Sequence, residues 1–197
     1  MFGFCLSAAV VDLDTFHIGQ WMISRPVVMG PLMGWACGNV LLGAQMGALV
    51  ELLILAELPL GNAVTLNGAV TISSALLLTC GPHRTDPAVS LPAGFALGEL
   101  HRLVEKRERS WRNSLTRVAE RSVSLGESAP FGRIIAASMG RHVAITALFL
   151  FGSVLIAGPA LGWGWAQAPA AVRAAFAHAF DWTAWLGAAA LLLAFHK

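Results

Sequence analysis

Two carboxylates stand in an otherwise apolar part of the chain and are its first candidates for binding chemistry. Glu51 and Glu57 lie in the segment ELLILAEL, and a long uncharged run precedes Glu51. Six residues turn a helix through about 600°, so the two side chains do not share one face. A carboxylate in lipid costs roughly 2.5–3.5 kcal/mol on insertion scales, which makes it a functional-site hypothesis by default. Glu51 therefore carries the stronger prediction, whereas Glu57, before Leu58 and Pro59, fits an aqueous boundary.

A second candidate is the uncharged segment 59–68, which contains Gly61, Asn62 and Asn67. Irregular backbone survives at membrane depth only when it is buried in protein or lines a wet cavity. Broken helices and re-entrant hairpins of transporters have this texture and carry substrate. An ordinary turn outside the membrane explains the Asn67-Gly68 pair equally well. The local pattern leaves both interpretations open.

Metal, disulfide and enzyme chemistry find little support. Cys5, Cys37 and Cys80 are far apart and show no metal-ligand spacing, so neither a disulfide nor a metal site is predicted. The six histidines are scattered, with none near a carboxylate or cysteine at ligand spacing. No catalytic triad, phosphate-binding loop or zinc motif is present, so we predict no catalytic residue and no cofactor.

Composition indicates that lipid covers much of this chain. It has 197 residues, 56% hydrophobic and 12% charged, with mean hydropathy +0.67, whereas soluble domains carry roughly 25% charged residues. Nine of the thirteen Lys and Arg residues lie between Arg102 and Arg141. Four carboxylates are mixed among them and a fifth, Glu99, lies just before them, so a cytoplasmic loop that obeys the positive-inside rule explains the charge better than nucleic acid does.

The first half of the chain divides into several apolar segments. Residues 1–11 fit the end of a first span. Residues 26–50 are uncharged and carry glycines at four-residue spacing, which lets helices approach closely and favours a broken helix or two successive ones. Residues 69–80 predict a helix, and the prolines of 81–92 predict a loop.

The second half changes character. Residues 99–121 have apolar side chains at helical spacing among charges, which predicts an amphipathic helix on the membrane or on a partner. Residues 143–172 can supply one span and a turn. The last run, 182–195, is short for a span, so either 174–180 extends it or the chain stops before the fold is complete. We predict an all-α polytopic membrane protein with about five membrane segments, including one re-entrant hairpin, and a cytoplasmic amphipathic helix.

Several motifs in the first eighty residues occur in an order and at spacings that are characteristic of one family. They are LDTFHIGQWMISRP at 13–26, GPLMG at 30–34, GALVEL at 47–52 and LPLG at 58–61. Together they resemble the membrane subunit IIC of the mannose/fructose/sorbose family of bacterial sugar phosphotransferase systems (PTS). The similarity covers about residues 10–80, and the later region is similar only in layout.

The resemblance implies sugar transport by group translocation across the bacterial cytoplasmic membrane. A IID membrane subunit would pair with this chain, and soluble IIA and IIB subunits would supply the phosphate and bear the phosphorylated residues. The family's sugar-binding positions correspond to Glu51 and the loop from Gly61 to Asn67, including Asn62. Ser24 and Arg25 would order the hairpin or contact IID, and a structural salt bridge suits Arg25. The chain would form one IIC domain and assemble as an oligomer in the bilayer.

This one domain would have three regions: a sugar-binding core (1–80), a cytoplasmic amphipathic region (99–141) and C-terminal membrane helices (143–197). The sequence departs from the family pattern at Thr65-Leu66-Asn67 and at Asn39, and is shorter by what resembles a C-terminal hairpin. These departures motivate an alternative, a membrane scaffold or sensor of the IIC shape that transports nothing. A third possibility, an intramembrane enzyme, has no nucleophile–base pair behind it.

Overall fold

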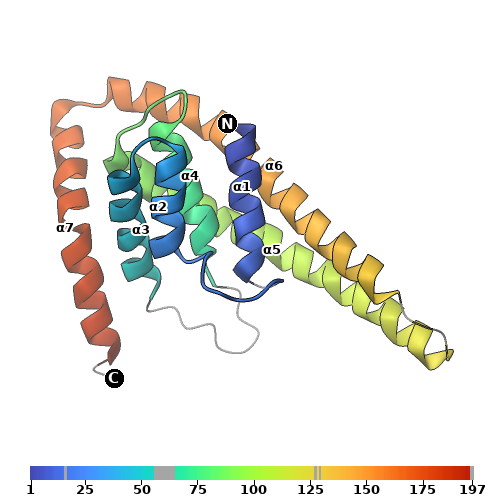
Figure 1. Cartoon of the computed structure of the whole chain (residues 1–197). Coiled ribbons are helices and arrows are strands. Elements are labelled where there is room, and N and C mark those ends of the chain that lie inside the picture. The colour runs from blue at the N-terminus through green and yellow to red at the C-terminus, as the bar shows by residue number, and fades with distance from the viewer. Residues whose placement is uncertain (16, 56–64, 127, 129, 196–197) are drawn as a thin grey trace.

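The computed structural model describes residues 1–15, 17–55, 65–126, 128 and 130–195. Within them every regular element is helical: α1 (Phe2–Asp12), η1 (Leu13–Thr15, a 3-10 helix), α2 (Pro26–Ala36), α3 (Val40–Ile54), α4 (Gly68–Cys80), α5 (Pro87–Ser124), α6 (Phe131–Gln167) and α7 (Ala170–Phe195). The helices form a bundle from which the far ends of α5 and α6 project as an antiparallel pair (Figure 1). The predicted all-α class is confirmed.

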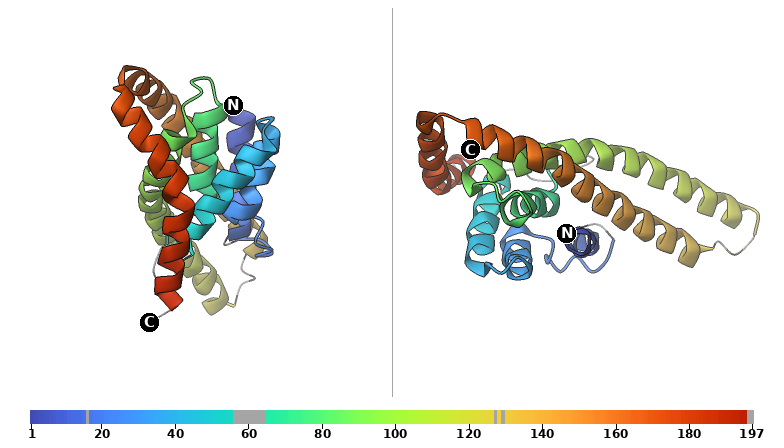
Figure 2. Two further views of the ribbon diagram at one scale, coloured as in Figure 1. Left: turned by 90° about the vertical axis from the view of Figure 1, so that its left-hand side faces the viewer. Right: turned by 90° about the horizontal axis from the view of Figure 1, so that it is seen from above.

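Helix α4 lies at the centre of the bundle, in contact with α1, α2, α3, α5 and α6 (Figure 2). Ten of its thirteen residues are buried, and Ile72 and Leu76 are fully enclosed. The helix begins where the Asn67 side chain accepts a hydrogen bond from the Val70 N–H, at 3.0 Å. A helix that is apolar all round is stable only when it is surrounded by other elements. The remaining helices are therefore arranged around α4.

Helices α2 and α3 form a hairpin whose seam is made of glycine. Gly30 and Gly34 of α2 face Gly43 and Gly47 of α3, with backbone against backbone. A Cβ atom on Gly43 would collide with the carbonyl oxygen of Gly30, and one on Gly34 would lie 2.8 Å from the Gly43 Cα. Small residues at this spacing allow the closest approach of two helices. The glycines at four-residue spacing thus form the contact between two successive helices. This is one of the two alternatives that the spacing predicted.

Helix α5 begins earlier than predicted, and its start corrects the expected loop at 81–92. The Asp86 side chain caps the helix by accepting a hydrogen bond from the Ala88 N–H at 2.9 Å, and Pro87 occupies the first helical turn. Proline at that position lacks only an N–H that would be unsatisfied anyway. Pro92 then lies inside the helix, so it does not mark the end of the loop.

One stripe of polar side chains on α5 points into the protein. His101, Glu105 and Glu108 are only 2%, 2% and 4% exposed, whereas Leu100 and Leu103 are 50% and 59% exposed. Other charged residues of the helix, such as Lys106 and Arg107, are exposed, so α5 carries ionisable groups on its inner side as well as on its outer side. In a membrane protein the outer surface faces hydrocarbon, and ionisable groups face the bundle interior. The amphipathic stretch predicted at 99–121 is therefore part of a longer helix that buries its polar stripe.

An ion pair fastens α5 to α6. The guanidinium of Arg141 binds the Glu108 carboxylate through Nε (3.0 Å to Oε1) and Nη2 (2.9 Å to Oε1), and its carbon lies 4.1 Å from the centre of the Trp111 ring. Arginine is suited to this double contact because its planar fork matches a carboxylate and its face stacks on an aromatic ring. The two long helices are thus joined by a charged contact between their side chains.

Two helices, α6 and α7, are long and apolar enough to cross a membrane. Helix α6 runs through Pro159 and ends at Gln167, followed by a turn, and α7 continues through Asp181 to the end of the described chain. The last apolar run is therefore extended by 174–180, the first of the two alternatives. Helices α1 to α4 have 11 to 15 residues and are about 16–22 Å long, less than the roughly 30 Å of a hydrocarbon core.

Two cysteines that are distant in sequence are neighbours in the fold. Cys37 follows the last residue of α2 and Cys80 ends α4, and their thiols lie near enough to interact with each other. Both are free thiols. Their contact places the end of the α2–α3 hairpin beside the end of α4, a proximity that sequence spacing does not reveal.

We expect Gly43→Ala to destabilise the α2–α3 hairpin, because its methyl group must push two backbones apart. Overpacking of this kind costs about 1–3 kcal/mol. Gly152→Ala in α6 is the matched control, since no atom lies within 4 Å of the added Cβ and alanine is the better helix former. Thermal unfolding in detergent, followed by tryptophan fluorescence, should show a lower Tm for the first variant only. An unchanged Tm for Gly43→Ala would contradict the glycine seam.

Mild oxidation should join Cys37 to Cys80. Copper phenanthroline and oxygen applied to the detergent-solubilised protein should give a 37–80 linked peptide in a non-reducing digest analysed by mass spectrometry. Cys5 is buried and serves as the internal control, because it should stay unlinked. Failure to find the 37–80 peptide, with both thiols still accessible to a maleimide, would contradict the packing of α2 against α4.

Candidate functional site

The connection between α1 and α2 is folded around Asp14. Its carboxylate accepts hydrogen bonds from the backbone N–H groups of Trp21 (2.7 Å), Ile23 (2.8 Å) and Ser24 (3.3 Å). Burial alone would raise the pKa of Asp14, but these donors stabilise the carboxylate and lower the pKa below its usual value. The loop therefore has a fixed path, which delivers Ser24 and Arg25 to the start of α2.

Arg25 forms an ion pair with Glu51. The Nη1 atom of Arg25 lies 2.9 Å from Oε1 of Glu51, and Oε2 lies 3.4 Å from the backbone nitrogen of Val27. The Glu51 side chain is 17% exposed and that of Arg25 is 45% exposed. The pair links the start of α2 to the last turn of α3. Two residues singled out from the sequence, in separate roles, are thus in direct contact.

A cleft of about 500 Å³ opens beside this ion pair. Its walls come from the Asp14 loop, the start of α2, the end of α3, the start of α4 and one residue of α5. The polar side chains among the lining residues are Asp14, Thr15, Gln20, Ser24, Arg25, Thr65, Asn67 and Glu105. Its volume is within the range of small-ligand sites, roughly 300–1,000 Å³, and such sites combine apolar walls with a few polar groups.

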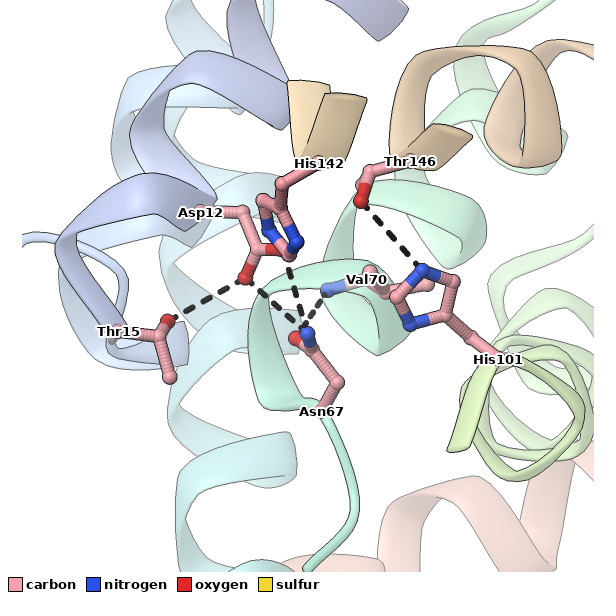
Figure 3. Close-up of polar contacts among 7 residues, drawn as sticks. All are labelled: Asp12, Thr15, Asn67, Val70, His101, His142 and Thr146. Carbon is pink, nitrogen blue, oxygen red and sulfur yellow. Dashed lines mark hydrogen bonds and ion pairs between the residues drawn. The ribbon is translucent and has the colours of Figure 1, made fainter. Parts of the chain in front are cut away.

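A buried polar cluster lies behind the cleft, centred on Asp12 (Figure 3). Asp12 is 1% exposed. Its Oδ1 accepts hydrogen bonds from the Asn67 amide (3.1 Å) and the Thr15 hydroxyl (3.3 Å), and its Oδ2 lies 2.9 Å from Nε2 of His142. A buried carboxylate is tolerated only when such partners replace water. Asp12 therefore ties α1 to the start of α4 and to α6.

Histidines from three elements lie close to this cluster. The ring centre of His17 is 4.8 Å from that of His142, and Nε2 of His101 lies 3.5 Å from the Thr146 hydroxyl oxygen. Sequence spacing placed no histidine beside a carboxylate, but in the fold His142 contacts Asp12, which is 130 positions away. The sequence carries one signal for this contact: Asp12 directly follows the apolar residues 1–11, and His142 directly precedes the uncharged residues 143–172. Among the described residues no group of His, Cys, Asp or Glu could hold a metal ion.

The described residues that the sequence predicted for the site lie in the cleft or at its rim. Ser24 and Arg25 line the cleft, and Glu51 reaches it through Arg25. Asn67 lines the cleft too, but its amide nitrogen is bound to Asp12 and its oxygen to the Val70 N–H. Gly61 and Asn62 lie outside the described residues.

Comparison with known proteins identifies the family. A family model described as "PTS system sorbose-specific IIC component" matches residues 2–196. The chain belongs to this family. It is therefore a membrane component of a sugar phosphotransferase system, as the motifs of residues 13–61 predicted.

Two further comparisons agree with this assignment. Over 98 residues the IIC chain is 32% identical to "Putative N-acetylgalactosamine permease IIC component 2" of Escherichia coli (strain K12), which covers 49% of this chain and 72% of that protein. It also superimposes on a solved structure titled "Structure of membrane protein" with a TM-score of 0.78 and 14% identity, over 97% of this chain and 77% of that one. The second match shows the fold alone.

Removing the imidazole of His142 should destabilise this IIC chain. His142→Ala leaves Asp12 buried without its α6 partner, and an unsatisfied buried charge costs about 1–3 kcal/mol or more. His178→Ala on the exposed surface of α7 is the control. Thermal unfolding in detergent should show a clear loss of Tm for His142→Ala and none for His178→Ala. Equal Tm values would mean that the Asp12–His142 contact contributes nothing to stability.

Proposed function

We propose that this chain binds a hexose-like sugar in the cleft beside Arg25 and Glu51. In this proposal it carries the sugar across the bacterial cytoplasmic membrane, coupled to phosphorylation by partner subunits. The observation that carries the proposal is the cleft itself, a space of about 500 Å³ with charged and amide side chains among apolar walls, in a chain of the sorbose-type IIC family. A sugar hydroxyl both donates and accepts hydrogen bonds, so charged and amide side chains around apolar walls suit it.

Each predicted site residue has a role in this proposal. Glu51 acts at the rim, where its ion pair with Arg25 orients the guanidinium toward the cleft and can exchange for sugar hydroxyls. Asn67 acts at the back of the cleft, where its bond to Asp12 fixes the start of α4. Ser24 holds the loop against Asp14. Gly61 and Asn62 belong to the same proposed site by their place in the sequence between α3 and α4.

The topology we propose places the projecting ends of α5 and α6 in the cytoplasm, because they carry most of the basic residues. The turn of the α2–α3 hairpin lies at the opposite end of the bundle (Figure 1). Helices α2 and α3 are each too short to cross, so we assign this pair as a re-entrant hairpin. The hairpin predicted at 59–68 lies, for residues 59–64, outside the described residues. The cleft then opens toward the cytoplasm, in keeping with a state that releases sugar to the phosphorylating subunits.

The partners in this proposal are a IID membrane subunit, soluble IIA and IIB subunits, and further copies of the complex. Helix α7 supports the membrane partner, since only 6% of its candidate span is buried within the chain. Its outer surface suits lipid or the helices of IID. The sugar-binding core would occupy residues 1–80, with the cytoplasmic region at 99–141 and the C-terminal membrane helices at 143–197.

The proposal predicts saturable sugar binding that depends on Glu51. The purified chain, co-expressed with its IID partner, should bind one sugar among mannose, glucose, fructose, sorbose and amino sugars. Glu51→Gln should weaken that binding at least about tenfold, because it removes the charge that pairs with Arg25 and hydroxyls. Glu99→Gln is the control, since Glu99 is paired with Arg102 on the outer side of α5.

The outcomes of these measurements distinguish a transport subunit from a membrane scaffold or sensor. Loss of uptake in cells by Glu51→Gln, with membrane insertion unchanged, would support a transport role for this carboxylate. Normal uptake by that variant would remove Glu51 from the site. A folded complex that binds none of the sugars would contradict the proposal and favour a scaffold or sensor.

A further inference from the structure

We propose that Glu105 of α5 binds the sugar directly, by accepting hydrogen bonds from its hydroxyl groups. This inference rests on the proposed function and adds a residue from outside the segment with family motifs. Glu105 is 2% exposed and yet lines the cleft. Its Oε1 is buried and has no hydrogen-bond partner among the described residues. A buried carboxylate oxygen without a partner is costly, so it points to a donor that arrives with a ligand.

The other carboxylate on the same helix face is paired within the protein, whereas Oε1 of Glu105 is not. His101, four residues before it, lies 3.5 Å from the Thr146 hydroxyl through Nε2. Glu108, three residues after it, binds Arg141 through two nitrogens. Residues at these spacings lie on one side of a helix. Of the two carboxylates on this buried stripe, Glu108 has a strong cationic partner within α6, and Glu105 faces the cleft instead.

The other acidic groups at the cleft are already occupied. Asp14 accepts hydrogen bonds from three backbone N–H groups, and Glu51 is bound to Arg25. The amide of Asn67 is bound to Asp12 and Val70. A ligand that enters the cleft therefore finds in Glu105 a carboxylate oxygen that no described residue occupies.

The chemistry of the cleft favours a polyhydroxylated ligand. Arg25 offers only hydrogen-bond donors and Glu105, when ionised, only acceptors. A sugar hydroxyl can satisfy both kinds of group, since it donates through its hydrogen and accepts through its oxygen. Adjacent hydroxyls on a hexose ring can thus bind acceptor and donor side chains at once. A rigid helix positions Glu105, so it can discriminate between sugars that differ at one hydroxyl.

The test measures sugar affinity in the purified complex of this chain with its IID partner. Glu105→Gln keeps the shape of the side chain but weakens it as an acceptor, and should reduce affinity at least about tenfold. Glu99→Gln, on the exposed side of the same helix, is the matched control and should bind as the wild type does. Thermal unfolding of both variants checks that each is folded. Glu105→Asp, which retains the charge but shortens the side chain, should also bind more weakly.

Monodeoxy analogues of the bound sugar identify the contact. For the wild type, one analogue should bind markedly more weakly than the sugar. For Glu105→Gln, that same analogue should lose much less, because the hydroxyl and the carboxylate are partners. An equal loss for every analogue in both proteins would overturn direct contact. Unchanged affinity of folded Glu105→Gln, with sugar binding by the wild type intact, would also overturn the inference but leave the proposed function standing. No binding by the wild type would overturn both.

Discussion

The architecture depends on one buried carboxylate, that of Asp12. It is enclosed in an apolar bundle, where an unpaired charge would be strongly unfavourable. It is stable there because Asn67, Thr15 and His142 approach it from three different elements. The position of α1 against α6 and the starting point of α4 are consequently set together. Since Asn67 also caps α4, the Asp12 carboxylate fixes the position of the back wall of the cleft through Asn67.

Lipid as the solvent explains why the remaining polar groups lie where they do. On the surface of a soluble protein the leucines of α5 would pack inside, and its ionisable side chains would not be buried. Here His101, Glu105 and Glu108 point inward, while Leu100 and Leu103 are exposed. An amphipathic pattern shows that a helix has two faces but does not say which is outside. The packing of α5 against α4 and α6 shows which face is inside. Residues 99–121, which the sequence predicted as a surface helix, therefore contribute to the wall of the cleft.

Local patterns predicted some features of this protein well and could not reach others. The glycines of residues 30–47 indicated a close contact of helix backbones, because that signal lies within a few turns of chain. The family motifs led to Arg25 and Glu51, which are in contact. The Asp12–His142 pair joins positions 130 residues apart, and no spacing rule reaches that far. The loop predicted at 81–92 ends at Asp86, because Pro87 stands in the first helical turn, which tolerates proline, and Pro92 lies inside α5.

The α2–α3 hairpin is closed at both of its ends. At one end Asn39 caps α3 by accepting a hydrogen bond from the Leu42 N–H at 3.0 Å, and at the other Arg25 binds Glu51. Between them the glycine seam has no side chains that could change rotamer. The two helices are therefore held together at their turn, along the seam and at their open end. A ligand that separated Arg25 from Glu51 would remove the contact at the open end and leave the Asn39 cap and the glycine seam in place.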